Sequence, residues 1–147
     1  MYTKTNFCRT AFCLLLLVAV FTSCKKDDKK ATEISMANIA GTYKFTLMTY
    51  QYNNDPVENI LQDLDACDQD NTVTFKVNST YSYVDIGLVC SPSSAHDGTW
   101  AVPNTNTFEL DGESMTIDSF DGTNLKLTNI YTSTGSTETY HYTFTRQ

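Results

Sequence analysis

The chain has 147 residues and a formal net charge of −7, a size that suits a single domain. Four lysines within residues 25–30 conceal how acidic the remainder is. From Ala31 onward there are fifteen Asp and Glu against four Lys and Arg, which gives a net charge of −11. Nucleic-acid binding depends on cationic contacts with phosphates, so this charge excludes nucleic acid as a partner.

A signal peptide is predicted at the N-terminus. Lys4 and Arg9 form a small positive region, and the apolar run AFCLLLLVAVF follows at residues 11–21. A transmembrane helix needs roughly twenty apolar residues, so this run is too short to span a membrane. A secretory signal peptide over residues 1–23 is the better interpretation.

The sequence FTSC at residues 21–24 resembles a bacterial lipobox, in which a signal peptidase cuts before a cysteine that then carries diacylglycerol. The resemblance implies a lipidated Cys24, palmitate-type acylation and a flexible tether over residues 24–37. The protein would then be a lipoprotein anchored to the outer membrane of the cell envelope through its lipid. The alternative is an incidental cysteine after an ordinary signal peptide. Residues 26–28, Lys-Asp-Asp, resemble a short export signal of surface-exposed lipoproteins, which would place the domain outside the cell.

The remaining cysteines agree with an exported protein. Once the two cysteines of the signal peptide and Cys24 are set aside, one pair is left, Cys67 and Cys90. We expect these two to form a disulfide rather than remain free thiols. Two cysteines and two isolated histidines match no ligand spacing, so no metal site is expected.

Short strands are predicted from Gly41 onward, because apolar and polar residues alternate. The first strand is predicted at residues 41–52. Helical spacing of apolar residues at 60–64 then predicts one short helix or structured loop, capped near Asn54 or Asp55. The apolar residues that mark the eight predicted strands are Tyr43, Phe45 and Leu47; Val73, Phe75 and Val77; Tyr81 and Tyr83; Trp100 and Val102; Phe108 and Leu110; Met115 and Ile117; Leu125 and Leu127; and Tyr140, Tyr142 and Phe144. Those expected to face the interior are Tyr43, Phe45, Leu47, Phe75, Tyr83, Trp100, Phe108, Leu110, Met115, Leu127, Tyr142 and Phe144.

Eight short strands joined by tight turns predict an all-β fold. We expect an eight-stranded antiparallel up-and-down barrel over residues 38–147, with the short helix or structured loop after the first strand. Closure of a barrel removes the sheet edges that template aggregation, so a monomeric domain is expected. A β-sandwich is the alternative, because strand count alone does not distinguish the two folds.

Several segments together resemble the lipocalin-like domain family of Gram-negative bacterial lipoproteins. The resemblance extends from about Ala40 to Gln147, and the sequences that carry it are GTYKF at 41–45, CDQDNTVTFKVNSTYSY at 67–83, Cys90 followed by GTW at 98–100, and YHYTFTR at 140–146. It implies a lipocalin-like barrel more firmly than it implies an activity.

The barrel interior is the candidate ligand site. An eight-stranded barrel is either filled by its own side chains or holds one small ligand. Asp85 continues the face of the third predicted strand toward a polar mouth. Candidate ligand-binding residues are Tyr43, Phe45, Phe75, Tyr83, Asp85, Trp100, Phe108 and Tyr142. The same aromatic residues would also suit a packed core with hydrogen-bonded phenols.

No catalytic residue and no cofactor is predicted. The sequence contains no Gly-x-Ser-x-Gly, no His-Glu-x-x-His and no Gly-rich phosphate loop. The four aspartates within residues 63–70 are interpreted as a solvated loop; a calcium site is the alternative, but residues 67–68 break the EF-hand pattern. Glu109, Asp111 and Glu113 lie beside a turn and are interpreted as surface charge.

Two classes of function remain. The first is a membrane-anchored barrel that binds a small hydrophobic or amphipathic molecule, which requires an internal cavity. The second is a non-catalytic module for cell-envelope interaction or glycan binding, with a packed barrel interior. Glycan binding would use exposed tyrosines such as Tyr50, Tyr52 and Tyr131.

Overall fold

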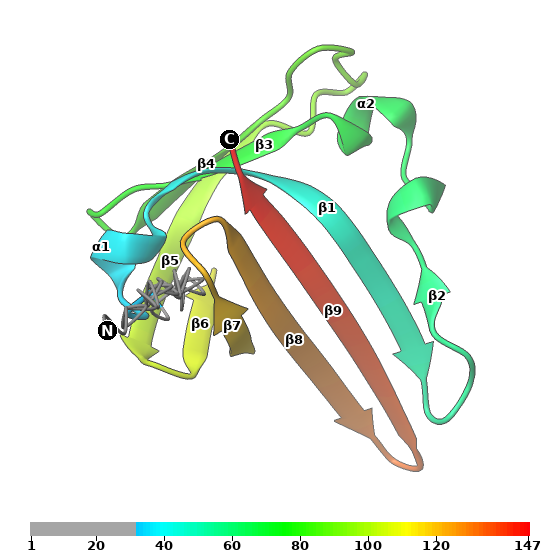
Figure 1. Ribbon diagram of the computed structural model, residues 1–147. Helices are drawn as coiled ribbons and strands as arrows, with labels where there is room; N and C mark the ends of the chain where they lie inside the picture. Colours follow the sequence, from blue (N-terminus) through cyan, green and yellow to red (C-terminus); the bar gives the residue numbers. More distant parts are fainter. Residues whose placement is uncertain (1–31) are drawn as a thin grey trace, which may run out of the picture.

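The computed structural model describes residues 32–147 (Figure 1). The predicted signal peptide, Cys24 and residues 25–31 of the predicted tether lie outside the described residues. The first described element is the helix α1 (Met36–Ile39), whose N-cap Ser35 accepts a hydrogen bond from the Asn38 N–H at 3.3 Å. Within residues 32–147, no helix is long and apolar enough to span a membrane.

One antiparallel sheet makes up most of the domain. Its strand order is β2-β1-β3-β4-β5-β6-β7-β8-β9, and a further pairing of β1 with β9 closes it. The closed barrel therefore has eight strands, and the two-residue β2 is an addition beside β1. The elements after α1 are β1 (Gly41–Tyr52), β2 (Glu58–Asn59), the 3₁₀ helix η1 (Leu61–Asp63), α2 (Ala66–Gln69), β3 (Thr72–Phe75), β4 (Thr80–Val84), β5 (His96–Asn104), β6 (Thr107–Leu110), β7 (Glu113–Phe120), β8 (Asn124–Ser133) and β9 (Ser136–Arg146).

The eight-stranded up-and-down barrel predicted from the sequence is confirmed, and the sandwich alternative is wrong. Sequential strands pair with their neighbours, and the first and last strands pair along nine residue positions from Tyr43↔Arg146 to Tyr52↔Glu138. The predicted short helix or structured loop after the first strand is also confirmed. It consists of η1 and α2, and the N-cap of α2 is Asp65.

Several predicted boundaries differ from the structure. Val77 is not on a strand face, because β3 ends at Phe75 and Val77 is 71% exposed in the following turn. The fourth predicted strand begins at His96 rather than at Trp100. The helix α1 starts at Met36, within the predicted tether of residues 24–37, and Ile39 is fully buried.

A bulge in β1 changes which side chains face the interior. The register between β1 and β9 shifts between Phe45 and Leu47. A bulge adds one residue to a strand and so reverses the alternation of faces beyond it. Phe45 therefore contacts Phe144 inside the barrel, whereas Leu47, predicted to face inward, is 40% exposed. Beyond the bulge, Tyr50 takes the inward-facing phase and contacts Tyr140.

We call the end at which β1 begins and β9 ends the closed end of the barrel. Ile39 of α1 is buried there, and the Tyr43 hydroxyl donates to the Ile39 carbonyl at 2.7 Å. Arg146 Nη2 donates to the Tyr43 hydroxyl at 2.7 Å and to the Asn38 carbonyl at 2.6 Å. The Arg146 guanidinium lies over the Tyr43 ring, 5.2 Å from its centroid. Together these contacts fasten α1 across this end.

Phe75 lies at the centre of an aromatic cluster next to the closed end. Its ring contacts those of Tyr43, Tyr81, Trp100, Phe108 and Phe144, with centroids 5.0–6.2 Å apart. Burial of each such ring stabilises the fold by roughly 2 kcal/mol. The Trp100 Nε1–H donates to the Lys76 carbonyl at 2.8 Å, so the indole is buried without an unsatisfied donor.

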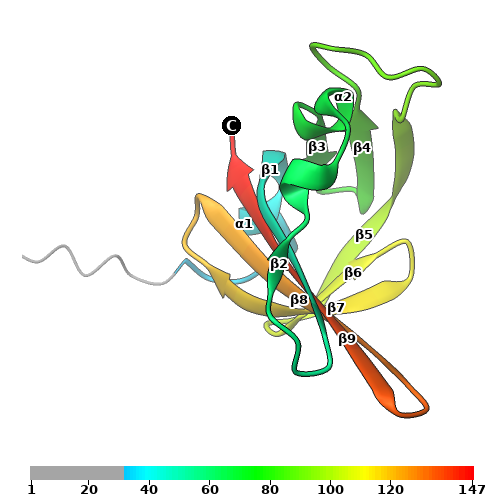
Figure 2. The ribbon, with the colours of Figure 1, turned by 90° about the vertical axis from the view of Figure 1, so that its right-hand side faces the viewer.

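The strands β8 and β9 extend beyond the barrel wall on the side away from α1 (Figure 1 and Figure 2). The ladder between β7 and β8 runs only from Thr116↔Thr128 to Phe120↔Leu125. Past that point β8 pairs with β9 alone, as far as Ser133↔Ser136. The projecting parts of β1, β8 and β9 form a three-stranded ribbon.

Candidate functional site

A cavity of about 200 Å³, which we call cavity 1, lies inside the barrel. The strands β1, β3, β4, β5, β6 and β9 supply its walls, and the lining is almost entirely apolar or aromatic. The lining residues are Phe45, Val73, Phe75, Tyr81, Tyr83, His96, Leu110 and Phe144. The aromatic residues beside Phe75 therefore do not fill the interior completely.

The polar groups around cavity 1 are occupied by the protein itself. The Tyr81 hydroxyl donates to Asp111 Oδ2, and burial together with this carboxylate raises the pKa of Tyr81 to about 12. His96 Nδ1 donates to the Ser94 carbonyl at 2.8 Å, while its ring packs on Tyr83 at 5.1 Å between centroids. Burial also raises the pKa of Tyr83. Cavity 1 thus presents rings rather than charges to a ligand.

A second cavity, cavity 2, measures about 170 Å³ and lies where β7 and β8 separate. One part of its lining is apolar and the other is polar. The lining residues are Phe45, Leu110, Glu113, Met115, Asn129, Tyr131, Tyr142 and Phe144. The polar residues form a chain, in which Asn129 Nδ2 donates to the Tyr131 hydroxyl at 2.8 Å and that hydroxyl donates to Glu113 Oε2 at 2.9 Å.

The two cavities share three lining residues, Phe45, Leu110 and Phe144. The Phe45 and Phe144 rings are in contact, with centroids 4.3 Å apart. Side chains from β1, β6 and β9 therefore form the partition between the cavities. A change of rotamer at Phe45 or Leu110 would join them into one elongated space.

Tyrosine rings continue from cavity 2 onto the ribbon. Tyr142 and Tyr140 lie parallel, with an interplanar angle of 7°, and Tyr140 contacts Tyr50 of β1 and Tyr131 of β8. Burial, followed by the influence of neighbouring tyrosines and Glu113, raises the pKa of Tyr142 to about 12. All these phenols are therefore neutral near pH 7, and their rings form a continuous aromatic surface.

A closed eight-stranded barrel with an internal cavity can be compared with known families. The sequence model of the lipocalin-like domain family matches residues 39–137. The chain belongs to the lipocalin-like domain family. No curated protein and no solved structure shows a significant match to the chain. The family resemblance predicted from the sequence is thus confirmed, and the matched range contains every residue lining the two cavities except Tyr142 and Phe144.

The predicted ligand-binding residues of the lipocalin-like domain divide into three groups. Phe45, Phe75 and Tyr83 line cavity 1, and Phe45 and Tyr142 line cavity 2. A second group is buried near the closed end and lines neither of these cavities: Tyr43, Trp100 and Phe108. Asp85 forms the third group, because it lies in the loop after β4 instead of the barrel interior.

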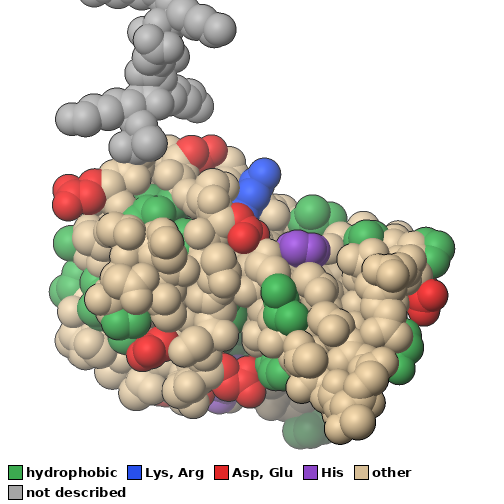
Figure 3. Space-filling model, turned by 90° about the horizontal axis from the view of Figure 1, so that it is seen from below, with side chains coloured by type: hydrophobic (Ala, Val, Ile, Leu, Met, Phe, Trp, Pro, Cys, Tyr) green, Lys and Arg blue, Asp and Glu red, His purple; other side chains and the backbone are tan. Residues whose placement is uncertain are grey.

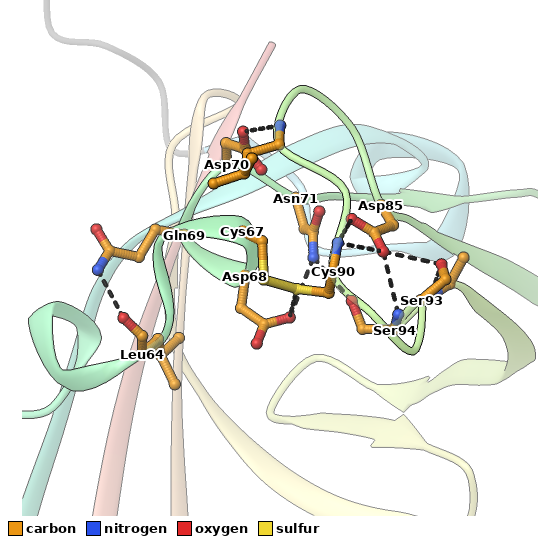
Figure 4. Close-up of a disulfide and its surroundings, with 12 residues drawn as sticks. Leu64, Cys67, Asp68, Gln69, Asp70, Asn71, Asp85, Cys90, Ser93 and Ser94 are labelled. Carbon is orange, nitrogen blue, oxygen red and sulfur yellow. Dashed lines mark hydrogen bonds between the residues drawn. A yellow bond between two sulfur atoms is a disulfide. The ribbon is translucent and has the colours of Figure 1, made fainter.

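Asp85 organises the loop that the disulfide closes (Figure 4). Its carboxylate accepts hydrogen bonds from Ser93 Oγ at 2.8 Å, the Ser94 N–H at 3.1 Å and the Cys90 N–H at 3.2 Å. Desolvation acts to raise the pKa of Asp85, but these hydrogen bonds outweigh it and lower that pKa. The period-two pattern placed Asp85 inward only because the end of β4 at Val84 is not visible in the sequence.

The predicted disulfide between Cys67 and Cys90 is confirmed, with the two Cα atoms 5.2 Å apart. It joins α2 to the loop between β4 and β5. The only converging group of possible metal ligands in residues 32–147 is Cys67, Asp68 and Cys90, and both of these cysteines are in the disulfide. The four aspartates of residues 63–70 do not converge on one point, so the calcium alternative has no support here.

The polar side of cavity 2 has no signature in the sequence. Glu113 is exposed, as the interpretation as surface charge expects, and it also lines the cavity and accepts from the Tyr131 hydroxyl. Asn129 is 7% exposed and carried no signal in the sequence, because it follows the alternating pattern of β8 like any strand residue. Leu110 and Met115 were placed on inward faces, but nothing indicated that they border a cavity.

Proposed function

We propose that the protein is a membrane-anchored lipoprotein whose lipocalin-like barrel binds a small hydrophobic or amphipathic ligand. The observation that carries the proposal is cavity 1, an apolar space of about 200 Å³ lined by side chains of six strands. Ligand sites are typically concave, mostly apolar and largely formed before the ligand arrives. A packed barrel would leave no such space.

The size of the cavities limits the ligand. An apolar cavity of about 150 Å³ is large enough to hold benzene. Cavity 1 therefore suits an apolar group slightly larger than a benzene ring. A longer molecule would need the partition of Phe45 and Leu110 to move, so that part of it lies in cavity 2.

The proposed role is binding rather than catalysis. One hydrogen-bonded set resembles a catalytic arrangement: Thr128 Oγ1 donates to Asp118 Oδ2 at 2.6 Å and lies 2.7 Å from His141 Nδ1. None of these three residues lines cavity 1 or cavity 2. The set therefore lies outside both cavities and is best explained as cross-strand hydrogen bonding.

The ligand proposal is tested by enlarging Leu110, a side chain that lines both cavities. Leu110→Phe adds volume where the cavities meet, and Leu110→Met is the matched control because it conserves volume. We expect 2-phenylethanol to raise the melting temperature and change the Trp100 fluorescence of the natural protein. Leu110→Phe should weaken that binding by at least about tenfold, and Leu110→Met by less than about threefold. Absence of binding, or binding that Leu110→Phe leaves unchanged, would count against the proposal.

The membrane anchor is proposed from the FTSC sequence and the charged residues after it. We expect Cys24→Ala to release the protein into the soluble fraction and to abolish incorporation of labelled palmitate. A variant that still pellets with membranes and still takes up palmitate would contradict the anchor. Protease treatment of intact cells tests the surface location indicated by residues 26–28, since a protected domain would be periplasmic.

The second candidate function is glycan binding or another envelope interaction on the outer surface. Tyr52 and Tyr131 support it, because they are 41% and 46% exposed on the ribbon. Tyr50, named with them in the sequence, packs on Tyr140 instead. Oligosaccharides belong in the same thermal-shift screen; stabilisation by sugars but not by apolar ligands would favour this candidate.

A further inference from the structure

Cavity 2 differs from cavity 1 in having a polar side and an apolar side. Phe45, Leu110, Met115 and Phe144 form its apolar side. Glu113, Asn129 and Tyr131 form the polar side, near the gap between β7 and β8. A ligand in this space would place an apolar group toward the barrel interior and a polar group at the gap.

The Glu113 carboxylate is held in position at that gap. Its Oε2 accepts from the Tyr131 hydroxyl at 2.9 Å, and Tyr131 is held in turn by Asn129, which is buried in the barrel wall. Within residues 32–147, no Lys or Arg forms an ion pair with Glu113. The negative charge at the cavity is therefore ordered but not neutralised by the described part of the chain.

The distribution of charge over the whole domain adds to the negative charge of Glu113. The four Lys and Arg of residues 32–147 all lie near the closed end. Lys44 is near the start of β1 and Lys126 near the start of β8, while Lys76 is in the β3–β4 turn and Arg146 is the last residue of β9. Seen from below, acidic side chains are scattered over the surface while Lys and Arg are sparse (Figure 3). Glu113 and Glu138 lie near the starts of β7 and β9, at the end of the barrel opposite the closed end. A negative field at this end attracts cations and repels anions.

Aromatic rings supply the second interaction that a cation needs. Tyr131 and Tyr142 both line cavity 2, and Tyr140 contacts both of their rings. The face of a tyrosine ring attracts an ammonium group, by about 0.5–2 kcal/mol depending on how far the group is desolvated. Two tyrosine rings and one hydrogen-bonded carboxylate line the same space, and this combination suits an organic cation.

We infer that cavity 2 binds an organic ammonium ion whose apolar part is about the size of a benzene ring. The ammonium group lies at the gap between β7 and β8, against Glu113 and the rings of Tyr131 and Tyr142. The apolar part packs on Phe45, Leu110 and Met115. Carboxylate ligands such as fatty acids are disfavoured, because they would place a second negative charge beside Glu113. This inference rests on the proposed ligand-binding function and names the chemical class of the ligand.

The experiment compares three probes of similar shape and different charge: 2-phenylethylammonium, neutral 2-phenylethanol and anionic 3-phenylpropanoate. Affinities are measured by titration calorimetry at low ionic strength with the folded protein. We expect the cation to bind about tenfold more tightly than the alcohol, and the anion to bind most weakly. The preference for the cation should shrink as salt is added, because the gap is open to solvent.

Two variants locate the charge that is responsible. Glu113→Gln keeps an acceptor for Tyr131 but removes the negative charge, so it should lower the affinity for the cation about tenfold and the affinity for the neutral alcohol by much less. Glu109→Gln is the matched control, since it removes one charge from the same β6–β7 hairpin at a residue that lines neither cavity 1 nor cavity 2. Unfolding of both variants in urea verifies that they are folded.

The outcomes separate this inference from the proposed function. If the alcohol binds as tightly as the cation, or if Glu113→Gln and Glu109→Gln act alike, the ammonium inference is overturned while apolar ligand binding stands. If none of the three probes binds, the proposed function fails and the inference fails with it. Tighter binding of the cation that depends on Glu113 supports both.

Discussion

Asp111 connects the β6–β7 turn to the barrel wall through both of its carboxylate oxygens. Oδ2 accepts from the Tyr81 hydroxyl and Oδ1 accepts from the Thr99 N–H at 2.8 Å. Its own N–H donates to the Thr99 carbonyl at 2.8 Å. Asp111 has a positive φ of 50° and precedes Gly112, so the turn itself directs the carboxylate back toward Tyr81. The carboxylate thus satisfies a buried hydroxyl beside cavity 1.

Asp111→Asn should destabilise the protein in a pH-dependent way. The hydrogen bond from Tyr81, followed by those from Thr99, lowers the pKa of Asp111 below its ordinary value. A depressed carboxyl pKa stabilises the fold above about pH 4, and this stabilisation is lost as the pH falls through the folded-state pKa. In urea unfolding, the free energy of unfolding of the natural protein should exceed that of Asp111→Asn at pH 7, and the difference should shrink as the pH falls below about 4. Glu109→Gln is the control, and a pH-independent difference for Asp111→Asn would contradict the argument.

Arg146 joins elements at the closed end, as Asp111 joins the β6–β7 turn to the barrel wall. One guanidinium nitrogen, Nη2, donates to the Asn38 carbonyl, the Ile39 carbonyl and the Tyr43 hydroxyl at 2.6–3.3 Å. The planar group also lies over the rings of Tyr43 and Phe120. The ring contacts need a flat cation, and the ammonium group of lysine has no such plane.

Arg146→Lys is therefore expected to be destabilising although it conserves charge. We expect a loss of about 2 kcal/mol in the free energy of unfolding, measured in urea, from the hydrogen bonds and ring contacts together. Lys126→Ala on the outer face of β8 serves as the control and should change stability by less than about 0.5 kcal/mol. If Arg146→Lys is as stable as the natural protein, Arg146 does not fasten α1.

At the scale of elements, the disulfide loop replaces regular structure on one side of the barrel. β3 pairs with only the first four residues of β1, Gly41–Lys44, and η1 and α2 follow β2 beside the rest of that strand. Asn71 is 2% exposed and links this region to the loop after β4, donating to Ser94 Oγ at 3.0 Å and accepting from the Ile86 N–H at 3.1 Å. The Cys67–Cys90 bond closes the same junction covalently.

Removal of the disulfide should cost roughly 3 kcal/mol, because it closes a loop of about 24 residues in the unfolded chain. The double variant Cys67→Ser, Cys90→Ser avoids leaving a free thiol, and its stability in urea should match that of the natural protein with dithiothreitol. The double variant itself should not respond to the reductant. A natural protein that is equally stable with and without dithiothreitol would show that the bond stabilises little.

The alternating pattern predicted the strands better than it predicted their faces. Turn residues and period-two alternation were enough to place eight strands, since each strand carries its own local signal. The bulge after Phe45 depends on pairing with β9, about 100 residues away, so Leu47 was assigned to the wrong face. The place of the exposed Glu113 beside cavity 2 could not be predicted for the same reason. Its partner Tyr131 lies on another strand, and the separation of β7 from β8 has no signature in either segment.

At the scale of the whole molecule, the chain enters the barrel at its closed end. α1 packs against Tyr43 and Arg146 there, while the ribbon of β1, β8 and β9 projects the other way (Figure 2). Only eight peptide steps separate Cys24 from Thr32, the first described residue, and they span at most about 30 Å. An anchor at Cys24 would therefore keep the closed end near the membrane. Cavity 2, with its acidic side, would face away from it.

This orientation predicts that two positions at opposite ends of the barrel lie at different distances from the membrane. Asn78 lies in the β3–β4 turn near the closed end, and Thr134 lies in the β8–β9 turn; both residues are exposed. The two variants are Asn78→Cys and Thr134→Cys. Each variant of the lipidated protein carries a fluorophore at the new cysteine in phosphatidylcholine vesicles that contain spin-labelled lipid. Because quenching falls steeply with distance, the label at residue 78 should be quenched more strongly than the label at residue 134. In the soluble Cys24→Ala background the two labels should be quenched equally little. Stronger quenching at residue 134 would mean that the ribbon faces the membrane, so that ligands would enter cavity 2 from the bilayer rather than from solvent.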